Sequence, residues 1–196
     1  MDLYKVGKAL CSVIFYPLYR IKVVGKENIP KTGPVIICSN HISNVDPPVV
    51  GITNSRNIYF LAKEELFKNK VIGGILKRVH AFPIKRGMRD RNALRKGLDI
   101  LNENHALGLF PEGSRQKNGE IGRGLAGIGF FALRSQAAVV PCAIIGPYRK
   151  FKPLKVAYGK PIDIQSYRDE KASAQVVTDY IMEEIRQLHK IHSEKG

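Results

Sequence analysis

A histidine and an aspartate flank a short polar turn in "SNHISNVDPPV", residues 39–49. Histidine is well suited to moving a proton near neutral pH, and a nearby carboxylate can fix its tautomer and hold its charge. His41 and Asp46 are therefore candidates for a general base and its orienting acid, but a nucleophile is missing. Each residue also has a simpler interpretation. His41 fits a hydrogen-bonded loop histidine, and Asp46, followed by two prolines, is typical of a helix N-cap.

Two further polar clusters follow apolar runs. The stretch "FPEGSRQKNGEIGRG", residues 110–124, carries three basic residues among four glycines, and "AFPIKRG" ends in Lys85, Arg86 and Gly87. Glycine lets a backbone approach a phosphate, a helix N-terminus favours an anion, and arginine can bind two phosphate oxygens at once. Both clusters suit a phosphate ligand. Solvated basic loops have the same composition, so both interpretations stay open.

The charge of the chain predicts an anionic partner. Its 196 residues include 32 Lys and Arg against 17 Asp and Glu, a formal net charge of +15. Nucleic acid, an acidic membrane, a phosphorylated substrate or an acidic protein would fit. We find no zinc spacing, RNP-like aromatic block or recognition-helix unit, so we expect no nucleic acid. The three scattered cysteines form no C-x-x-C pair, which argues against a disulfide framework or a metal site and favours a reducing environment.

Short β-rich apolar runs alternate with helical spacing from residue 33 onward. This alternation predicts a single α/β domain with a mixed, largely parallel sheet flanked by helices, and functional groups at the strand ends. A long amphipathic helix should end the chain. The strands are expected near residues 33–40, 58–63, 80–85, 106–113, 138–146 and 154–161, and the helices near 47–54, 64–78, 89–104 and 123–135, with Val177, Ile181, Ile185, Leu188 and Ile191 on one face of the last helix.

The N-terminus has an apolar helical pattern with lysines elsewhere around the helix. Its apolar run, "ALCSVIFYPLY", is about half the roughly 20 residues that a spanning helix needs, so we expect it neither to cross a bilayer nor to be a removed signal. It suits a helix in a membrane interface, and equally one packed on the core. We expect a membrane-associating segment, residues 1–20, before a domain at 21–196. The basic, amphipathic stretch 66–89 also suits anionic lipid headgroups or an acidic carrier. The N-terminal stripe comprises Leu3, Val6, Leu10, Val13, Ile14 and Leu18.

Four blocks occur in order along the chain: "NHISNVDP", "AFPIKRG", "FPEGSR" and "VVPCAI". With them the chain resembles the glycerolipid acyltransferases, most closely the bacterial 1-acyl-glycerol-3-phosphate acyltransferases, over roughly residues 20–160. One departure is Ser114, where threonine is commoner in the family; both residues carry a hydroxyl.

The resemblance supplies the missing nucleophile. In this family the free hydroxyl of the lipid acceptor attacks the thioester of an acyl-CoA or acyl carrier protein, which agrees with the lack of a G-x-S-x-G elbow in this chain. His41 would take the hydroxyl proton and Asp46 would orient the ring. No metal or cofactor is implied. The implied substrate-binding residues are Lys85, Arg86, Glu112, Gly113, Ser114, Arg115 and Pro141, although Pro141 equally suits a strand-shaping role.

The implied reaction transfers a fatty acyl group to the sn-2 hydroxyl of 1-acyl-glycerol-3-phosphate (lysophosphatidic acid), giving phosphatidic acid in phospholipid biosynthesis. The enzyme would sit peripherally on the cytoplasmic face of the cell membrane, against its anionic surface. Glycerol 3-phosphate or another lysolipid remains an alternative acceptor. A thioesterase would use the same histidine and aspartate with water as the acceptor.

Overall fold

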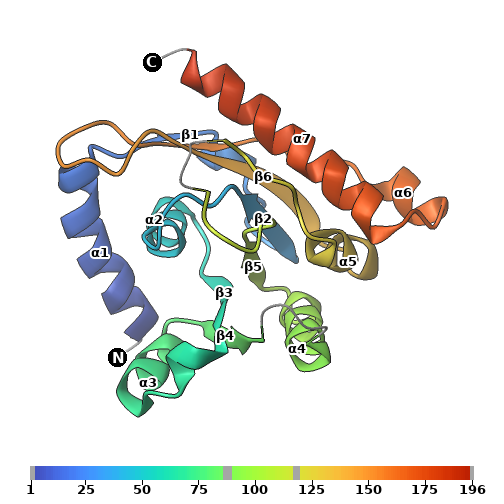
Figure 1. Ribbon diagram of the computed structural model, residues 1–196, viewed down its shortest axis with the longest axis horizontal. Helices are drawn as coiled ribbons and strands as arrows, with labels where there is room; N and C mark the ends of the chain where they lie inside the picture. The colour runs from blue at the N-terminus through green and yellow to red at the C-terminus, as the bar shows by residue number, and fades with distance from the viewer. Residues whose placement is uncertain (1–2, 86–89, 117–119, 195–196) are drawn as a thin grey trace.

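The structure is a computed structural model that describes residues 3–85, 90–116 and 120–194. Helices pack on both faces of one twisted sheet (Figure 1). The strands are β1 (Lys22–Val24), β2 (Val35–Ser39), β3 (Ile58–Lys63), β4 (Ala81–Ile84), β5 (Ala106–Leu109), β6 (Ala138–Ile145) and β7 (Lys155–Tyr158). The helices are α1 (Leu3–Tyr19), α2 (Asp46–Thr53), α3 (Lys70–Arg78), α4 (Arg91–Asn102), α5 (Gly127–Arg134), α6 (Gln165–Asp169) and α7 (Ala174–Ser193), with 3₁₀ turns η1 (Lys26–Asn28) and η2 (Glu64–Phe67).

The sheet confirms the predicted α/β fold. Its strand order is β1-β7-β6-β2-β5-β3-β4. Every neighbouring pair is parallel except β6 and β7, which run antiparallel. The central strand β2 is buried along its whole length, which explains why its sequence is a continuous apolar run rather than an alternating one.

Two apolar cores lie on the two faces of the sheet. Ile36 and Cys38 of β2 belong to the core formed with α4, α5 and α7. Val35 and Ile37 point the other way, into the core that contains α2 and one face of α1. Alternate residues of one strand therefore anchor both helical layers, which fixes the position of the β2 carboxyl end.

Most predicted elements are confirmed, and two helix boundaries are corrected. The expected helix at 64–78 is split, because the Asn69 side chain accepts hydrogen bonds from the N–H groups of Val71 and Ile72 and so caps a new start at α3. Helix α5 begins at Gly127 rather than near residue 123. The patterns missed β1 and α6, which are only 3 and 5 residues long. Helix α7 confirms the expected C-terminal helix.

Helix α1 contacts the core with the side opposite to its apolar stripe. Tyr4 is buried, and Cys11, Phe15 and Tyr19 pack against the core beneath. The middle of the stripe faces outward, with Leu10 60% exposed and Val13 74% exposed, while Leu3 and Leu18 at its ends are half-buried. None of the described helices is both long enough and apolar enough to cross a membrane.

Candidate active site

Most of the candidate residues that the structure describes lie at the edge of the sheet where the parallel strands end. His41 follows β2, Glu112 follows β5, and Lys85 follows β4. Because β2, β5, β3 and β4 are parallel and adjacent, their carboxyl ends meet at one edge. The fold thus brings together groups that are as much as 71 residues apart in the chain.

His41 and Asp46 form a buried, hydrogen-bonded pair. The distance from His41 Nδ1 to Asp46 Oδ2 is 2.7 Å, and the exposed fractions of the two residues are 8% and 0%. An ionised carboxylate can only accept, so Nδ1 carries the proton, and in the neutral ring Nε2 is left with its lone pair. The pair has the arrangement that a general base and its orienting group require.

Asp46 does not cap α2. It is the first residue of that helix, and the preceding position, Val45, makes no side-chain cap. The Asp46 carboxylate points back instead, and Oδ2 accepts hydrogen bonds from the N–H groups of Ile42 and Ser43 at 2.7 and 2.8 Å. The N-cap interpretation of Asp46 is therefore wrong. The turn after β2 is closed around the carboxylate that meets His41.

The remaining surroundings of His41 hold its ring and its backbone. The imidazole stacks on Phe110, with ring centroids 4.3 Å apart. The His41 N–H donates to Glu112 Oε1 at 3.3 Å, and the His41 carbonyl accepts from the N–H of Gln116 at 2.8 Å. The loop after β5 therefore clamps His41 on both sides of its backbone.

Glu112 and Gly113 shape that loop. Gly113 has a φ of +67°, a left-handed conformation that suits glycine and strains other residues. Glu112 is buried, and burial raises the pKa of its carboxyl above 4.5, against smaller opposing effects led by the N–H and ring of His41. Oε2 makes no hydrogen bond of good geometry within the described part of the chain. Glu112 therefore places a buried carboxyl group with a raised pKa directly beside the backbone of His41.

The raised pKa of Glu112 predicts a pH-dependent cost to stability. The folded state binds this proton more tightly than the unfolded chain, so stability falls as the pH rises from about 4.5 through the raised pKa. Glu112→Gln keeps an oxygen for the His41 N–H and has no charge to bury. We expect this variant to gain free energy of unfolding relative to the wild type as the pH rises from 4 to 7, measured by urea unfolding at both pH values. The exposed Glu65→Gln should show no such trend. A difference in free energy of unfolding between Glu112→Gln and the wild type that stays constant with pH would contradict the prediction.

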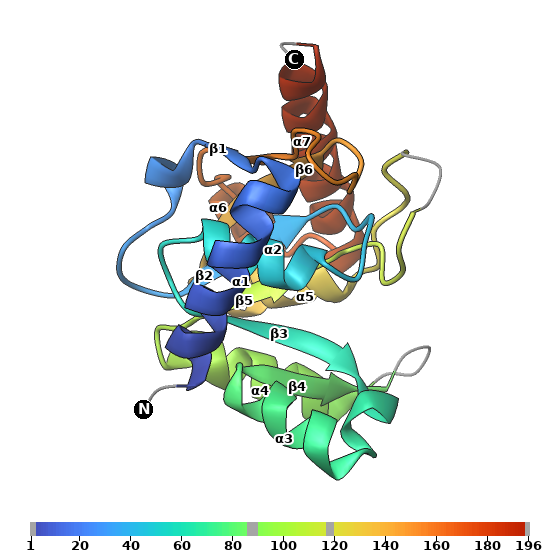
Figure 2. The same ribbon diagram turned by 90° about the vertical axis from the view of Figure 1, so that its left-hand side faces the viewer.

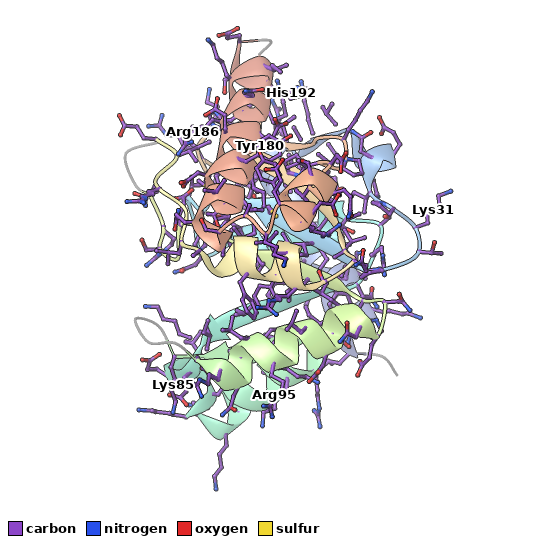
Figure 3. The ribbon with its side chains drawn as sticks, turned by 90° about the vertical axis from the view of Figure 1, so that its right-hand side faces the viewer. Lys31, Lys85, Arg95, Tyr180, Arg186 and His192 are labelled. Atoms are coloured by element: carbon purple, nitrogen blue, oxygen red, sulfur yellow. The ribbon has the colours of Figure 1, made fainter. Side chains whose placement is uncertain are left out.

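The charged and hydroxyl candidates lie on the outside of this edge. Ser114 and Arg115 follow Glu112 and are exposed. The exposed Lys85 is shown with Arg95 on the outer surface around β4 and α4 (Figure 3), and its ammonium lies 3.7 Å from Glu64 Oε1. Arg86 lies outside the described residues. Arg115 and Lys85 are therefore available to an incoming anion, while His41, Asp46 and Glu112 form the buried part of the site.

Pro141 lies inside the sheet rather than at its edge. It is a buried residue of β6, in register with Cys38 of β2, and its carbonyl accepts from the N–H of Gly159. This position suits the strand-shaping role, and its contact with substrate stays a prediction.

Two residues of the site were missed by sequence reasoning. The Asn40 side chain bonds to both the N–H and the carbonyl of Ile144, which joins the end of β2 to β6. The Tyr148 hydroxyl donates to Asp46 Oδ1 at 2.7 Å. A local cue is absent for Tyr148, which is 102 residues from Asp46. Asn40 adjoins His41, and its signal in the sequence was a polar residue at the end of a continuous apolar run.

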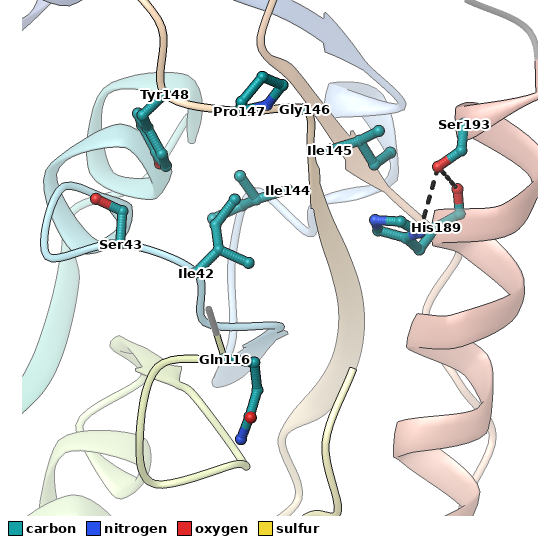
Figure 4. A pocket seen from close by; sticks show the side chains of 10 residues that line it. All are labelled: Ile42, Ser43, Gln116, Ile144, Ile145, Gly146, Pro147, Tyr148, His189 and Ser193. Carbon is teal, nitrogen blue, oxygen red and sulfur yellow. Dashed lines mark hydrogen bonds between the residues drawn. The ribbon is translucent and has the colours of Figure 1, made fainter. Parts of the chain in front are cut away.

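A cavity of about 520 Å³ lies beside the pair. Figure 4 shows Ile42, Ser43 and Tyr148 on one side of it and His189 of α7 on the other, where the Ser193 hydroxyl bonds to His189. Its lining is mostly apolar, and its polar side chains are Ser43, Gln116, Tyr148, His189 and Ser193. The cavity reaches the candidate pair through Ile42, Ser43 and Tyr148, the residues whose N–H and hydroxyl groups bond to Asp46.

Comparisons with known proteins agree with this geometry. A family model described as Acyltransferase matches residues 20–145. The 1-acyl-sn-glycerol-3-phosphate acyltransferase of Bacillus subtilis is 30% identical over 95% of this chain and 96% of its own length. A second relative is LPAT1 of Arabidopsis thaliana, a chloroplastic 1-acyl-sn-glycerol-3-phosphate acyltransferase. It is 30% identical, and the match covers 72% of this chain but only 40% of LPAT1.

Among solved structures, the LPA acyltransferase PlsC of Thermotoga maritima has the same fold. The TM-score is 0.74 at 23% identity, and the match covers 96% of this chain and 78% of that one. The family model spans the strand ends that carry His41, Asp46 and Glu112. The expected family is confirmed, and the chain belongs to the acyltransferase family.

Proposed function

We propose that this protein is a 1-acyl-sn-glycerol-3-phosphate acyltransferase that converts lysophosphatidic acid to phosphatidic acid. The observation that carries the proposal is the His41 Nδ1 to Asp46 Oδ2 contact of 2.7 Å at the strand ends, which leaves Nε2 as a base for a substrate hydroxyl. The names of the relatives from Bacillus subtilis and Arabidopsis thaliana support this choice of acceptor.

The proposed reaction is a direct transfer. His41 Nε2 takes the proton of the sn-2 hydroxyl as its oxygen attacks the thioester carbonyl, and Asp46 stabilises the imidazolium that forms. The tetrahedral intermediate then expels the thiolate, which takes the proton from His41. A carbon–oxygen bond replaces a carbon–sulfur bond, and the histidine returns to its starting state. Because transfer from a thioester to an ester is downhill, the proposal needs no metal or cofactor.

Charge supports anionic substrates for this site. The net charge of +15 attracts lysophosphatidic acid as well as acyl-CoA or acyl carrier protein, the two proposed donors. The loop with Arg115 follows directly on the Glu112 clamp, so a phosphate bound by Arg115 would lie next to the base.

Replacing Arg115 should selectively weaken use of the acceptor. Arg115→Ala removes a charged hydrogen bond to phosphate, so we expect the KM for lysophosphatidic acid to rise about 10- to 100-fold, with the KM for acyl-CoA nearly unchanged. Steady-state kinetics with each substrate varied in turn will measure this. Arg134→Ala, which removes an exposed arginine at the end of α5, is the matched control. Equal KM values for wild type and Arg115→Ala would contradict phosphate binding by Arg115.

The identity of the acceptor can be tested with a panel. Purified protein with one labelled acyl-CoA is offered lysophosphatidic acid, glycerol 3-phosphate, lysophosphatidylcholine or no acceptor. The proposal predicts phosphatidic acid as the main product. Lysophosphatidic acid formed from glycerol 3-phosphate would support the alternative acceptor. Free fatty acid released with every acceptor, and also without one, would indicate a thioesterase. The same panel with acyl carrier protein as the donor separates the two thioesters.

We also propose that the enzyme works at the anionic cytoplasmic face of the membrane, bound through α1 and α3. Figure 2 shows these helices on one side of the molecule, and Gly7 of α1 lies beside Val79, which follows α3. The described surface exposes Val6, Leu10, Val13 and Ile14 on α1, and Leu66, Val71, Ile72 and Ile75 on η2 and α3. Exposed lysines flank them, which suits acidic lipid headgroups.

Charges placed on α1 should weaken binding to vesicles. The pair Leu10→Glu and Val13→Glu replaces two exposed apolar side chains, so we expect the affinity for vesicles of phosphatidylcholine and phosphatidylglycerol to fall on the order of 100-fold in a flotation assay. The pair Val176→Glu and Ile191→Glu places the same two charges on α7, where these side chains are 50% and 49% exposed, and should leave binding unchanged. Undiminished binding of the α1 double variant would exclude this helix as the main contact.

A further inference from the structure

Tyr148 and His41 bond to different oxygens of the Asp46 carboxylate. Oδ2 accepts from His41 Nδ1 and from two backbone N–H groups, whereas Oδ1 accepts a hydrogen bond from the Tyr148 hydroxyl, at 2.7 Å. Asp46 is fully buried. A carboxylate held at both oxygens cannot rotate, so the direction in which it presents Oδ2 to the imidazole is fixed.

The loop that carries Tyr148 is tied down by the end of α1. The Tyr148 ring meets the Tyr19 ring edge to face, with centroids 5.1 Å apart. The N–H groups of Phe151 and Leu154 donate to the carbonyls of Leu18 and Tyr19 at 2.7 and 2.9 Å. Burial, followed by the charge of Asp46, raises the pKa of the Tyr148 hydroxyl far above its usual 10.0, so this group stays a donor at any working pH. The contacts with Leu18 and Tyr19 therefore fix the position of the Tyr148 side chain.

We propose that Tyr148 is a positioning residue for the acyl transfer, one that holds Asp46 so that His41 is aimed at the acceptor hydroxyl. The inference rests on the function proposed above for the catalytic step, although the positioning itself can be measured without substrate. Tyr148 also lines the cavity beside the pair, so a direct contact with substrate is the competing explanation. The two explanations predict different kinetics.

The first test is Tyr148→Phe, which removes the hydroxyl and keeps the ring that lines the cavity. Loss of a hydrogen bond to a charged group should lower kcat about tenfold. The KM values for both substrates should stay within about twofold. Tyr158→Phe is the matched control, because Tyr158 is a buried tyrosine whose hydroxyl bonds to Thr53 at the other end of α2. An unchanged kcat, or a raised KM with unchanged kcat, would overturn the proposal.

The second test asks whether Tyr148 acts through Asp46. In a double-mutant cycle with Asp46→Ala, the further change Tyr148→Phe should alter the residual rate by less than about twofold. A full additional tenfold loss would mean that Tyr148 acts independently of Asp46, which would overturn the proposal.

A third measurement needs no substrate and separates this inference from the proposed function. The N–H groups of Ile42 and Ser43 donate to the same carboxylate. If the Tyr148 hydroxyl fixes Asp46, these two amides should exchange with deuterium about tenfold faster in Tyr148→Phe and at the wild-type rate in Tyr158→Phe. Unchanged exchange would overturn the positioning role. A wild type that forms no phosphatidic acid, yet shows the faster exchange in Tyr148→Phe, would refute only the proposed function.

Discussion

Replacing His41 by alanine should lower the rate of acyl transfer by about 10²- to 10⁴-fold, because the acceptor hydroxyl then loses the base that takes its proton. The loss should appear mainly in kcat, since nothing that binds the phosphate is removed. Rates are measured as phosphatidic acid formed from lysophosphatidic acid and labelled acyl-CoA. Thermal unfolding followed by circular dichroism will check the fold, because the His41 ring also packs on Phe110.

The control for this variant is another histidine. His105 precedes β5, at the end of the strand away from the site, and its ring lies 3.7 Å from Glu103. His105→Ala should keep a rate within about threefold of the wild type. A folded His41→Ala protein with more than about a tenth of the wild-type rate would contradict the assignment of His41 as the base.

The second large effect is expected for Asp46→Asn, on the order of 10³-fold in kcat. The amide oxygen can still accept from His41 and the turn, and the amide nitrogen can donate to the Tyr148 hydroxyl, so the fold should survive. What is lost is the negative charge that stabilises the imidazolium during the transfer. The variant therefore separates charge from packing, and its rate is measured by the same product assay.

Asp99→Asn is the matched control for Asp46→Asn, because Asp99 is an exposed aspartate on α4. It should leave both the rate and the unfolding temperature unchanged. Retention of more than about a tenth of the activity by a folded Asp46→Asn protein would show that Asp46 is only structural.

Local patterns were enough to predict the sheet and the edge at which the site lies. The run at residues 35–39 is apolar throughout because β2 is buried on both faces, and the polar residues that follow it mark the strand end. Glu112 likewise is a polar residue that follows the apolar run of β5 and marks the end of that strand. Parallel strands then place these ends side by side, which a pattern of alternating strands and helices implies.

Other features depend on contacts that no local pattern records. The direction of the Asp46 side chain is set by the turn at residues 42–45, so spacing alone left its N-cap role open. The hydrogen bond from Tyr148 requires β6, its following loop and the end of α1 to meet. Helix α1 was predicted correctly, but the side it turns to the core depends on aromatic packing by Tyr4 and Phe15.

The most direct test is the time course of phosphatidic acid formation by the purified wild-type protein on anionic vesicles that contain lysophosphatidic acid. The donor is a labelled long-chain acyl-CoA or acyl carrier protein, and His41→Ala is measured under the same conditions. We expect the label to appear in phosphatidic acid with the wild type, in step with release of the free thiol, and His41→Ala to form product at least about 100-fold more slowly. Thiol released at the same rate without an acceptor, or product formed equally well by both proteins, would contradict this expectation.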